Sequence, residues 1–309
     1  MKSPAVLLLL LLACVAAHAQ TQVWHPSAGH MQISIWPGTP PDAQPMPGPE
    51  YGKIDPKSRE PIAAYNVSRP TMTVYAPKGK NSGAAVVVFP GGGFQMLAMA
   101  LEGTEICDWL TSNGITCVLL KYRAPSIPYD WHCDCRPHNF DLSVPSLQDA
   151  QRTIGLVRQH AREWHIDPHK VGVIGFSAGG FLVAEVSTQY ERRLYKPVDA
   201  ADTESSRPDF ALAIYPGHLT QDGHTFNRNL SVTRNTPPTF LVQAEDDDVD
   251  GVDQALVYFT ALKKAGVPTE LHIYAHGGHA FGLRHTSDPI TDWPKLAEMW
   301  MRTVGVVAN

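Results

Sequence analysis

Hydrophobic residues follow two patterns from position 71 onward: short, almost unbroken apolar runs, and longer stretches in which apolar residues recur every three or four positions. Runs of about four to eight β-branched and aliphatic residues are typical of strands that are buried on both faces of a parallel sheet. The sequence predicts seven such strands, at residues 71–76, 84–89, 115–121, 171–176, 210–215, 239–244 and 270–274.

Helical periodicity fills the segments between these runs. Apolar residues at 147, 150, 154 and 157 share one helix face, and Ser146 followed by Asp149 resembles the capping pair that opens a helix. A second apolar face spans 252–262 and ends before Gly266 and Pro268. Alternating strands and helices predict a single α/β domain over residues 71–309, with a doubly wound, mostly parallel sheet, helices on both faces, and sites at the carboxyl ends of the strands.

The N-terminal part of the chain has a different character. Residues 20–70 are rich in proline and polar residues and predict an extended lead-in, with one edge strand where apolar residues alternate at 32–36. Residues 1–19 predict a cleaved secretory signal peptide, because Lys2 precedes an apolar run that is too short to span a bilayer and ends in Ala-His-Ala. The alternative is a lipoprotein anchored through Cys14, since Leu-Leu-Ala-Cys resembles a lipobox. A signal peptide places the mature protein in the periplasm or outside the cell.

Composition and charge exclude several classes of protein. A chain with 43% hydrophobic and 18% charged residues has ample core-forming residues, which excludes a disordered protein. The 30 acidic residues outnumber the 25 basic ones, and the basic residues do not cluster, so nucleic acid is not an expected partner. No stretch after the leader reaches the ~18 apolar residues that a membrane helix needs, so no membrane span is expected.

The strongest chemical motif is Gly-Phe-Ser-Ala-Gly at 175–179, which lies directly between a predicted buried strand and a predicted helix. In this context the motif predicts a nucleophile elbow, because its glycines allow a sharp turn that exposes the hydroxyl of Ser177. A second glycine-rich turn, Pro-Gly-Gly-Gly-Phe at 90–94, follows another strand. The amides of Gly92, Gly93 and Ala178 are therefore candidates for an oxyanion hole. A phosphate-binding turn is the alternative, but no nucleotide-binding motif supports it.

The base that activates such a serine is a histidine held by a carboxylate. His279 stands in the segment His-Gly-Gly-His-Ala-Phe-Gly at 276–282, just past the last predicted strand, where glycines let the ring reach over the sheet edge. His276 is the alternative in the same segment. Four carboxylates at 245–248 directly follow the strand at 239–244. The chain order of serine, acid and histidine is the order found in α/β-hydrolases.

Five segments together resemble a known family: PGGGF, LEGTEICDWLTSNGITCVLLKYR, LQDAQRTIGLVRQHAREWHIDPHKVGVIGFSAGG, LVQAEDDDV and HGGHAFG. They look like secreted bacterial α/β-hydrolases of the acetyl-xylan-esterase and feruloyl-esterase-like group, related to the hormone-sensitive-lipase family, over residues 71–283. The resemblance implies a serine carboxylester hydrolase without a cofactor. Its implied reaction forms an acyl-enzyme, and its implied substrate is an acylated plant polysaccharide such as acetylated xylan.

The resemblance also selects one acid and shows two departures. In related hydrolases the acid of the triad lies three residues before a valine, and counting back from Val249 gives Asp246. The first departure is Pro90, where lipase relatives have histidine. The second is the pair Asp250 and Gly251 after Val249, where many relatives have Val-Pro.

Other residues are weaker candidates. We expect Phe94 and Trp131 to contact substrate, with coverage of apolar surface as the alternative for Trp131, and Cys107 and Cys117 to be small residues of the core. The segment WHCDCRPH at 131–138 allows a metal site, a disulfide or free thiols at Cys133 and Cys135, although its Cys-x-Cys spacing does not favour zinc.

Rival functions explain fewer of these features. A general esterase for small aryl or alkyl esters shares the same motifs, and a dipeptidyl-peptidase-like hydrolase is less expected because a propeller-sized extra domain is missing. A glycosidase that used the acidic cluster would leave Ser177 and His279 without a role. A binding protein on an inactive hydrolase fold usually lacks the serine or the histidine. The oligomeric state stays open.

Overall fold

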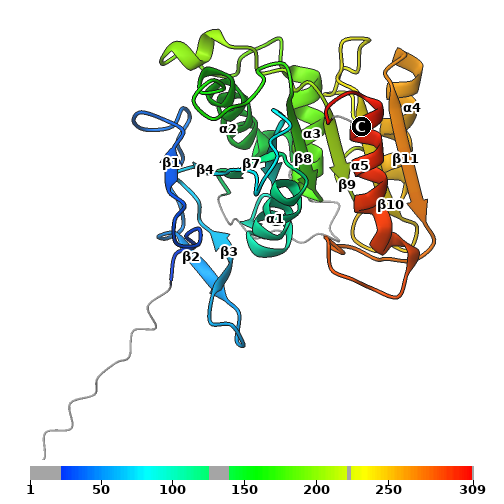
Figure 1. Cartoon of the computed structure of the whole chain (residues 1–309), viewed down its shortest axis with the longest axis horizontal. Coiled ribbons are helices and arrows are strands. Elements are labelled where there is room, and N and C mark those ends of the chain that lie inside the picture. Colours follow the sequence, from blue (N-terminus) through cyan, green and yellow to red (C-terminus); the bar gives the residue numbers. More distant parts are fainter. Residues whose placement is uncertain (1–21, 125–138, 221–223, 308–309) are drawn as a thin grey trace, which may run out of the picture.

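The central sheet of the protein contains the predicted edge strand and all seven strands predicted from residue 71 onward. The computed structural model describes residues 22–124, 139–220 and 224–307. In spatial order the eight strands are β1 (Gln32–Ser34), β4 (Thr71–Tyr75), β7 (Thr116–Lys121), β5 (Ala85–Phe89), β8 (Val171–Phe176), β9 (Ala211–Ile214), β10 (Thr239–Ala244) and β11 (Thr269–Tyr274) (Figure 1). Only the pairs β1–β4 and β4–β7 are antiparallel.

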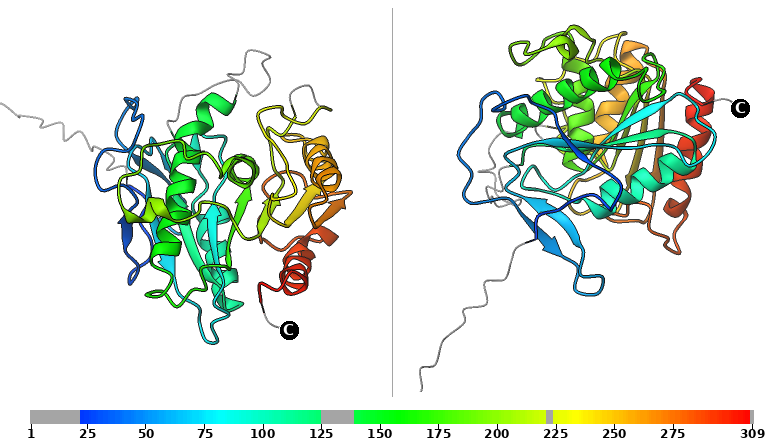
Figure 2. Two further views of the ribbon diagram at one scale, coloured as in Figure 1. Left: turned by 90° about the horizontal axis from the view of Figure 1, so that it is seen from above. Right: turned by 60° about the vertical axis from the view of Figure 1, so that its left-hand side comes forward.

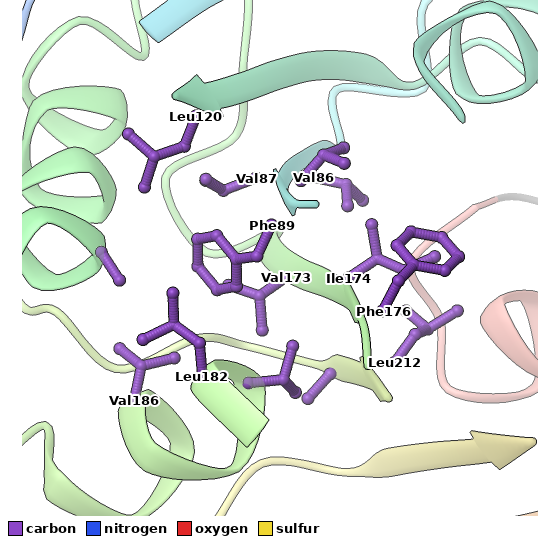
Figure 3. Packing of buried hydrophobic residues seen from close by; sticks show 14 of the residues in the cluster. Val86, Val87, Phe89, Leu120, Val173, Ile174, Phe176, Leu182, Val186 and Leu212 are labelled. Carbon is purple, nitrogen blue, oxygen red and sulfur yellow. The ribbon is translucent and has the colours of Figure 1, made fainter. Parts of the chain in front are cut away.

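The unbroken apolar runs form strands because both faces of the sheet are covered. Every residue of β5, β7, β8, β9 and β10 is buried. In the register of the sheet Val87 lies opposite Val118 on one side and Val173 on the other. Figure 3 shows the aliphatic and aromatic side chains of this core, including Phe89 and Phe176, between the strands and the adjacent helices. The core therefore fixes the strand ends at which the site is built.

Helices cover both faces of the sheet, as predicted (Figure 2). The helices α1 (Glu105–Ser112) and α5 (Trp293–Thr303) share one face, where the rings of Trp109 and Trp293 meet edge to face at 5.6 Å. The other face carries α2 (Asn139–Gln159), α3 (Ala178–Gln189) and α4 (Asp253–Ala265). A π-helical turn (Ala100–Thr104) precedes α1, and 3-10 turns lie at Ala200–Thr203 and Pro289–Asp292. The prediction of a doubly wound α/β fold is confirmed.

The predicted start of α2 is wrong. The helix begins at Asn139 and runs through Pro145, so Ser146 lies inside it. Ser146 donates its hydroxyl to the carbonyl oxygen of Arg123, 3.0 Å away. Asp149 accepts hydrogen bonds from the indole of Trp36 at 2.8 Å and from the backbone amide and guanidinium of Arg123. Both side chains of the pair that resembled a capping box are fully buried. Their hydrogen bonds join α2 to Arg123, just after β7, and to Trp36 of the lead-in.

The lead-in is more structured than its composition suggested. Besides β1 it forms a hairpin of β2 (Tyr51–Ile54) and β3 (Pro61–Tyr65), and β3 pairs with β6 (Met96–Leu97) in a second sheet. In Figure 1 the hairpin projects past the edge at which β11 ends. Because β6 directly follows the glycine-rich turn at 90–94, the lead-in is joined to the site region.

The prediction for Cys107 and Cys117 is only half right. Both residues are buried, as expected for core positions, but their sulfur atoms form a disulfide. Cys107 lies on α1 and Cys117 on β7, ten positions apart, and packing of the helix on the strand brings their Cα atoms to 5.2 Å. This Cα separation lies within the range that a disulfide requires.

Several predictions fall outside the described residues. They are the signal peptide at 1–19 with Cys14, and the loop that holds Trp131, Cys133 and Cys135. Within the ranges that the structure describes, no helix combines the length and apolar character needed to cross a membrane.

We predict that Asp149→Ala lowers the free energy of unfolding by about 3–5 kcal/mol, because it leaves the guanidinium of Arg123 buried without its partner. Asp108→Ala removes the same group from an exposed ion pair with Lys78 and should cost less than about 1 kcal/mol. Urea unfolding followed by circular dichroism measures both values. Equal losses in the two variants would contradict a structural role for the buried network.

Candidate active site

Ser177 occupies the sharp turn that the sequence predicts between β8 and α3. Its backbone has φ 54° and ψ −120°, a conformation that L-residues rarely adopt. Two glycines make the turn possible. A Cβ atom on Gly175 would lie 2.1 Å from the carbonyl oxygen of Gly179, and one on Gly179 would lie 2.0 Å from that of Phe89. The turn is therefore held in a strained form by backbone packing from both neighbouring segments.

His279 meets the serine as the sequence predicts. Its Nε2 atom lies 2.9 Å from Oγ of Ser177, which is hydrogen-bond distance. The ring comes from the loop after β11, and the edge of its plane faces the ring of Tyr215 at a centroid distance of 5.1 Å. His276, the alternative in the same segment, has a side chain that is 74% exposed and lies away from the serine. Of the two histidines, only His279 contacts Ser177.

The predicted contact between Asp246 and His279 is wrong. Asp247 fills this place, with its Oδ2 atom 2.8 Å from Nδ1 of His279. Asp246 is exposed; its carboxylate accepts the backbone N–H of Gly278 at 2.8 Å and lies 3.3 Å from Nδ1 of His276. Asp246 therefore stabilises the loop that carries His279 from its exposed side.

The one-residue error has a local cause in the turn after β10. Oδ1 of Asp247 accepts the backbone N–H groups of Val249 and Asp250, both at 2.9 Å, so this carboxylate closes the turn and points inward. Oδ2 also accepts the side-chain amide of Gln243 at 3.0 Å. Three fixed donors therefore orient the acid before it meets the histidine.

The glycine-rich turn at 90–94 packs directly against the serine. A Cβ atom on Gly91 would lie 2.9 Å from Cβ of Ser177 and 2.5 Å from the carbonyl oxygen of Phe176. Gly92 and Gly93 have φ of 128° and 63°, which favour glycine. Ala178 is the first residue of α3, where backbone N–H groups point away from the helix. The turn that carries Gly92 and Gly93 therefore approaches the serine through Gly91, and the role of these amides stays a prediction.

Phe94 does not lie where a substrate contact was expected. It is 1% exposed, and its ring packs near those of Tyr122, Phe181 and His218, at centroid distances of 6.2, 6.3 and 6.4 Å. The ring belongs to the packing beneath the turn, so its burial does not support the predicted role.

Sequence reasoning missed Glu102, a fully buried acid behind the turn. Its Oε2 atom accepts the N–H of Gly91 at 2.6 Å, and its Oε1 atom accepts the hydroxyl of Tyr215 at 2.9 Å. Burial raises the pKa of Glu102, although both hydrogen bonds oppose that rise. An acid within a largely apolar segment was the available signal.

A second missed acid, Asp250, stands on the serine side of the histidine. Its Oδ2 atom lies 3.5 Å from Oγ of Ser177 and 4.0 Å from Nε2 of His279. Burial raises the pKa of Asp250, while the nearby His218 and His279 lower it. The available signal was the departure from Val-Pro at this position.

The surrounding carboxylates control the charge of His279. Burial lowers the pKa of its ring, but the hydrogen bond that the ring donates to Asp247 and the charges of Asp250, Asp247 and Glu102 outweigh burial. The pKa of His279 is therefore raised above its usual value of about 6.5. An imidazole in this setting is a stronger proton acceptor than a free one.

Within the described ranges, no group of three or more histidine, cysteine or acidic side chains is arranged to hold a metal ion.

The chain is similar to known proteins in sequence. The acetylxylan esterase of Xylanibacter ruminicola is 32% identical over 224 residues, which cover 69% of this chain and 44% of the relative. The endo-1,4-beta-xylanase B of Butyrivibrio fibrisolvens is 24% identical over 242 residues, which cover 71% of this chain and 35% of the relative. The chain therefore spans less than half the length of the curated relatives it matches.

The chain is also similar in fold to a solved structure. The acetyl ester-xyloside bifunctional hydrolase from Caldicellulosiruptor lactoaceticus superposes with a TM-score of 0.69 at 31% identity, covering 90% of this chain and 97% of that one. These likenesses confirm the resemblance to acetylxylan-esterase-like α/β-hydrolases. The sequence profile of the prolyl oligopeptidase family matches residues 105–302, which is more than half of the chain. The chain belongs to the prolyl oligopeptidase family and carries the α/β-hydrolase fold of that family.

Proposed function

We propose that this protein is a serine carboxylester hydrolase that removes acyl groups, acetyl above all, from plant polysaccharides such as acetylated xylan. One observation carries the proposal. Oγ of Ser177, both nitrogen atoms of His279 and the carboxylate of Asp247 form a continuous chain of contacts of 2.9 and 2.8 Å. A serine, a base and an orienting acid in this relation are the requirements for nucleophilic catalysis on an ester.

In the proposed reaction His279 accepts the hydroxyl proton of Ser177 as Oγ attacks the ester carbonyl. Asp247 holds the ring so that Nε2 faces the serine, and it stabilises the imidazolium that forms. The imidazolium then gives its proton to the departing alcohol, which leaves an acyl-enzyme, and a water molecule attacks that ester in the same way. Amides of Gly92, Gly93 and Ala178 are the proposed donors to the developing oxyanion.

Glu102 has a positioning role in this proposal. It binds Gly91, the residue that contacts the serine, and Tyr215, whose ring lies against that of His279. One buried carboxyl thus links the turn that holds the oxyanion to the ring that moves the proton. Such a link keeps both in the geometry that the transition state requires.

The polysaccharide substrate is supported by the relatives. One of them is named an acetylxylan esterase and another is an acetyl ester-xyloside hydrolase. A general esterase for small aryl or alkyl esters would use the same residues, so rates on acetylated xylan and on p-nitrophenyl esters must be compared. A peptidase, which the family name suggests, would use the same residues, but the relatives named above are an acetylxylan esterase, a xylanase and an acetyl ester-xyloside hydrolase.

Secretion is part of the same proposal. Residues 1–19 read as a signal peptide, and the disulfide between Cys107 and Cys117 fits an oxidising compartment. A secreted enzyme would meet its polymeric substrate outside the cell.

Ser177→Ala should lower acetate release from acetylated xylan by about 10³ to 10⁶ in kcat and leave the fold intact, because the hydroxyl provides the nucleophile and little packing. Circular dichroism checks the fold. Labelling with a fluorophosphonate should occur in the wild-type protein and be lost in the variant. Wild-type turnover in the variant would refute the proposed nucleophile.

Asp247→Asn should lower kcat by up to about 10⁴, because the amide no longer fixes the tautomer of His279. Asp246→Asn, the matched change at the neighbouring exposed acid, should have a much smaller effect. Steady-state kinetics on acetylated xylan compare the two variants. If Asp246→Asn is the crippling change, the turn after β10 has a different register from the one described.

The acid side of the pH profile should report the raised pKa of His279. Ring protonation prevents the ring from accepting the serine proton, so kcat/KM should fall as the pH drops through this pKa. Because Asp247, Asp250 and Glu102 raise the pKa, the midpoint should lie above about 6.5. A profile of kcat/KM with its acid midpoint well below that value would contradict the described electrostatics.

A further inference from the structure

Asp250 is a buried carboxyl that lies outside the chain of contacts from Ser177 through His279 to Asp247. It is only 5% exposed, and its Oδ2 atom faces both reactive groups, Oγ of Ser177 at 3.5 Å and Nε2 of His279 at 4.0 Å. Asp247 already supplies the acid that orients the histidine. The second carboxyl therefore lies on the opposite side of the ring, beside the place where an ester must bind.

The carboxyl of Asp250 is only weakly hydrogen-bonded to the serine. Its contact with the serine, at 3.5 Å, is at the outer limit for a hydrogen bond, and its contact with the histidine is longer. The hydroxyl of Ser177 has one proton, which the catalytic chain directs to His279. Buried polar groups are nearly always paired, because burying one without a partner is costly.

The loop does not need this side chain for its own structure. The backbone of Asp250 makes the structural contacts: its N–H donates to Asp247 at 2.9 Å, and its carbonyl oxygen accepts the amide of Gln243 at 2.6 Å. Any residue except proline could keep both bonds at position 250. The cost of the buried carboxyl is thus not offset by the fold.

The absence of a side chain at Gly217 leaves space for the carboxyl of Asp250. Gly217, in the loop after β9, lies so close that a Cβ atom on it would be 2.4 Å from both carboxylate oxygens of Asp250. His218 follows in the same loop; burial and Asp247 raise the pKa of the Asp250 carboxyl, whereas His218 and His279 lower it. The carboxyl of Asp250 therefore fits against Gly217 and lies beside Ser177, the residue proposed to attack the ester.

We propose that Asp250 is a specificity-determining residue that accepts a hydrogen bond from a donor group of the substrate close to the scissile ester. Given the proposed function, on which this inference rests, the donor is a hydroxyl. It lies either on the sugar carbon next to the acylated carbon or on the acyl group itself. Substrates without such a donor leave the carboxyl unpaired in the Michaelis complex. A site of this kind discriminates strongly against analogues that lack the donor.

The test compares matched substrates in Asp250→Leu, which has a similar shape without polar atoms, and in Asp250→Asn, which keeps an acceptor oxygen. Methyl 2-O-acetyl-β-xyloside has a free neighbouring hydroxyl, and its 3-O-methyl ether lacks it. p-Nitrophenyl glycolate carries a hydroxyl on the acyl group, and p-nitrophenyl acetate does not. Asp248→Leu, a change at an exposed neighbour, is the control for disturbance of the loop.

In the wild-type protein we expect kcat/KM to be at least about tenfold higher for the hydroxyl-bearing member of one pair than for its partner. Asp250→Leu should abolish this ratio, Asp250→Asn should retain part of it, and Asp248→Leu should retain all of it. The pair that shows the effect tells whether the donor belongs to the alcohol or to the acyl group.

Two results would overturn the inference. One is a ratio close to one for both pairs in the wild-type protein. The other is an equal loss of kcat/KM on both members of each pair in Asp250→Leu, which would assign the carboxyl to the electrostatics of the triad. Failure of the proposed function looks different: either the wild-type protein hydrolyses none of the four esters, or Ser177→Ala hydrolyses them as fast as the wild type.

Discussion

The site depends on one constraint, the contact of backbone against backbone around Ser177. The serine is held at φ 54°, and this is possible only because the segments before, after and beside it approach to distances that exclude a Cβ atom at Gly175, Gly179 and Gly91. The strain is contained by the buried strands β5 and β8, which end at this point. The hydroxyl therefore has little freedom to leave the position where His279 meets it, and the rigid sheet is what supplies this precision.

Three carboxyls lie around the imidazole of His279, and each approaches it from a different side. Asp247 contacts Nδ1, Glu102 acts from behind through Tyr215, and Asp250 lies near Nε2. Together they favour the charged form of His279 despite its burial. This arrangement makes the ring a better base. Substitution of any one of the three acids therefore changes the proton affinity of the ring, which the other two acids also influence.

The sequence predicts features whose cause is local and misses those whose cause is not. Strands buried on both faces appear as unbroken apolar runs, and Ser177 is marked by its motif between a strand and a helix. The choice between Asp246 and Asp247 depends on which acid accepts the amides of the turn after β10, and composition does not encode this. The disulfide of Cys107, the pairing of the two-residue strand β6 and the contact of Glu102 with Gly91 likewise arise only when distant segments meet.

The hairpin of the lead-in and the glycine-rich turn are parts of one hydrogen-bonded assembly. Tyr65 of β3 pairs with Met96 of β6, and a Cβ atom on Gly92 would lie 2.3 Å from the sulfur of Met96. A shift of the hairpin is therefore passed to the backbone proposed to hold the oxyanion. Insertions or drift in the first 70 residues, far from every catalytic motif, thus give evolution a way to retune turnover while the serine, histidine and acid stay unchanged.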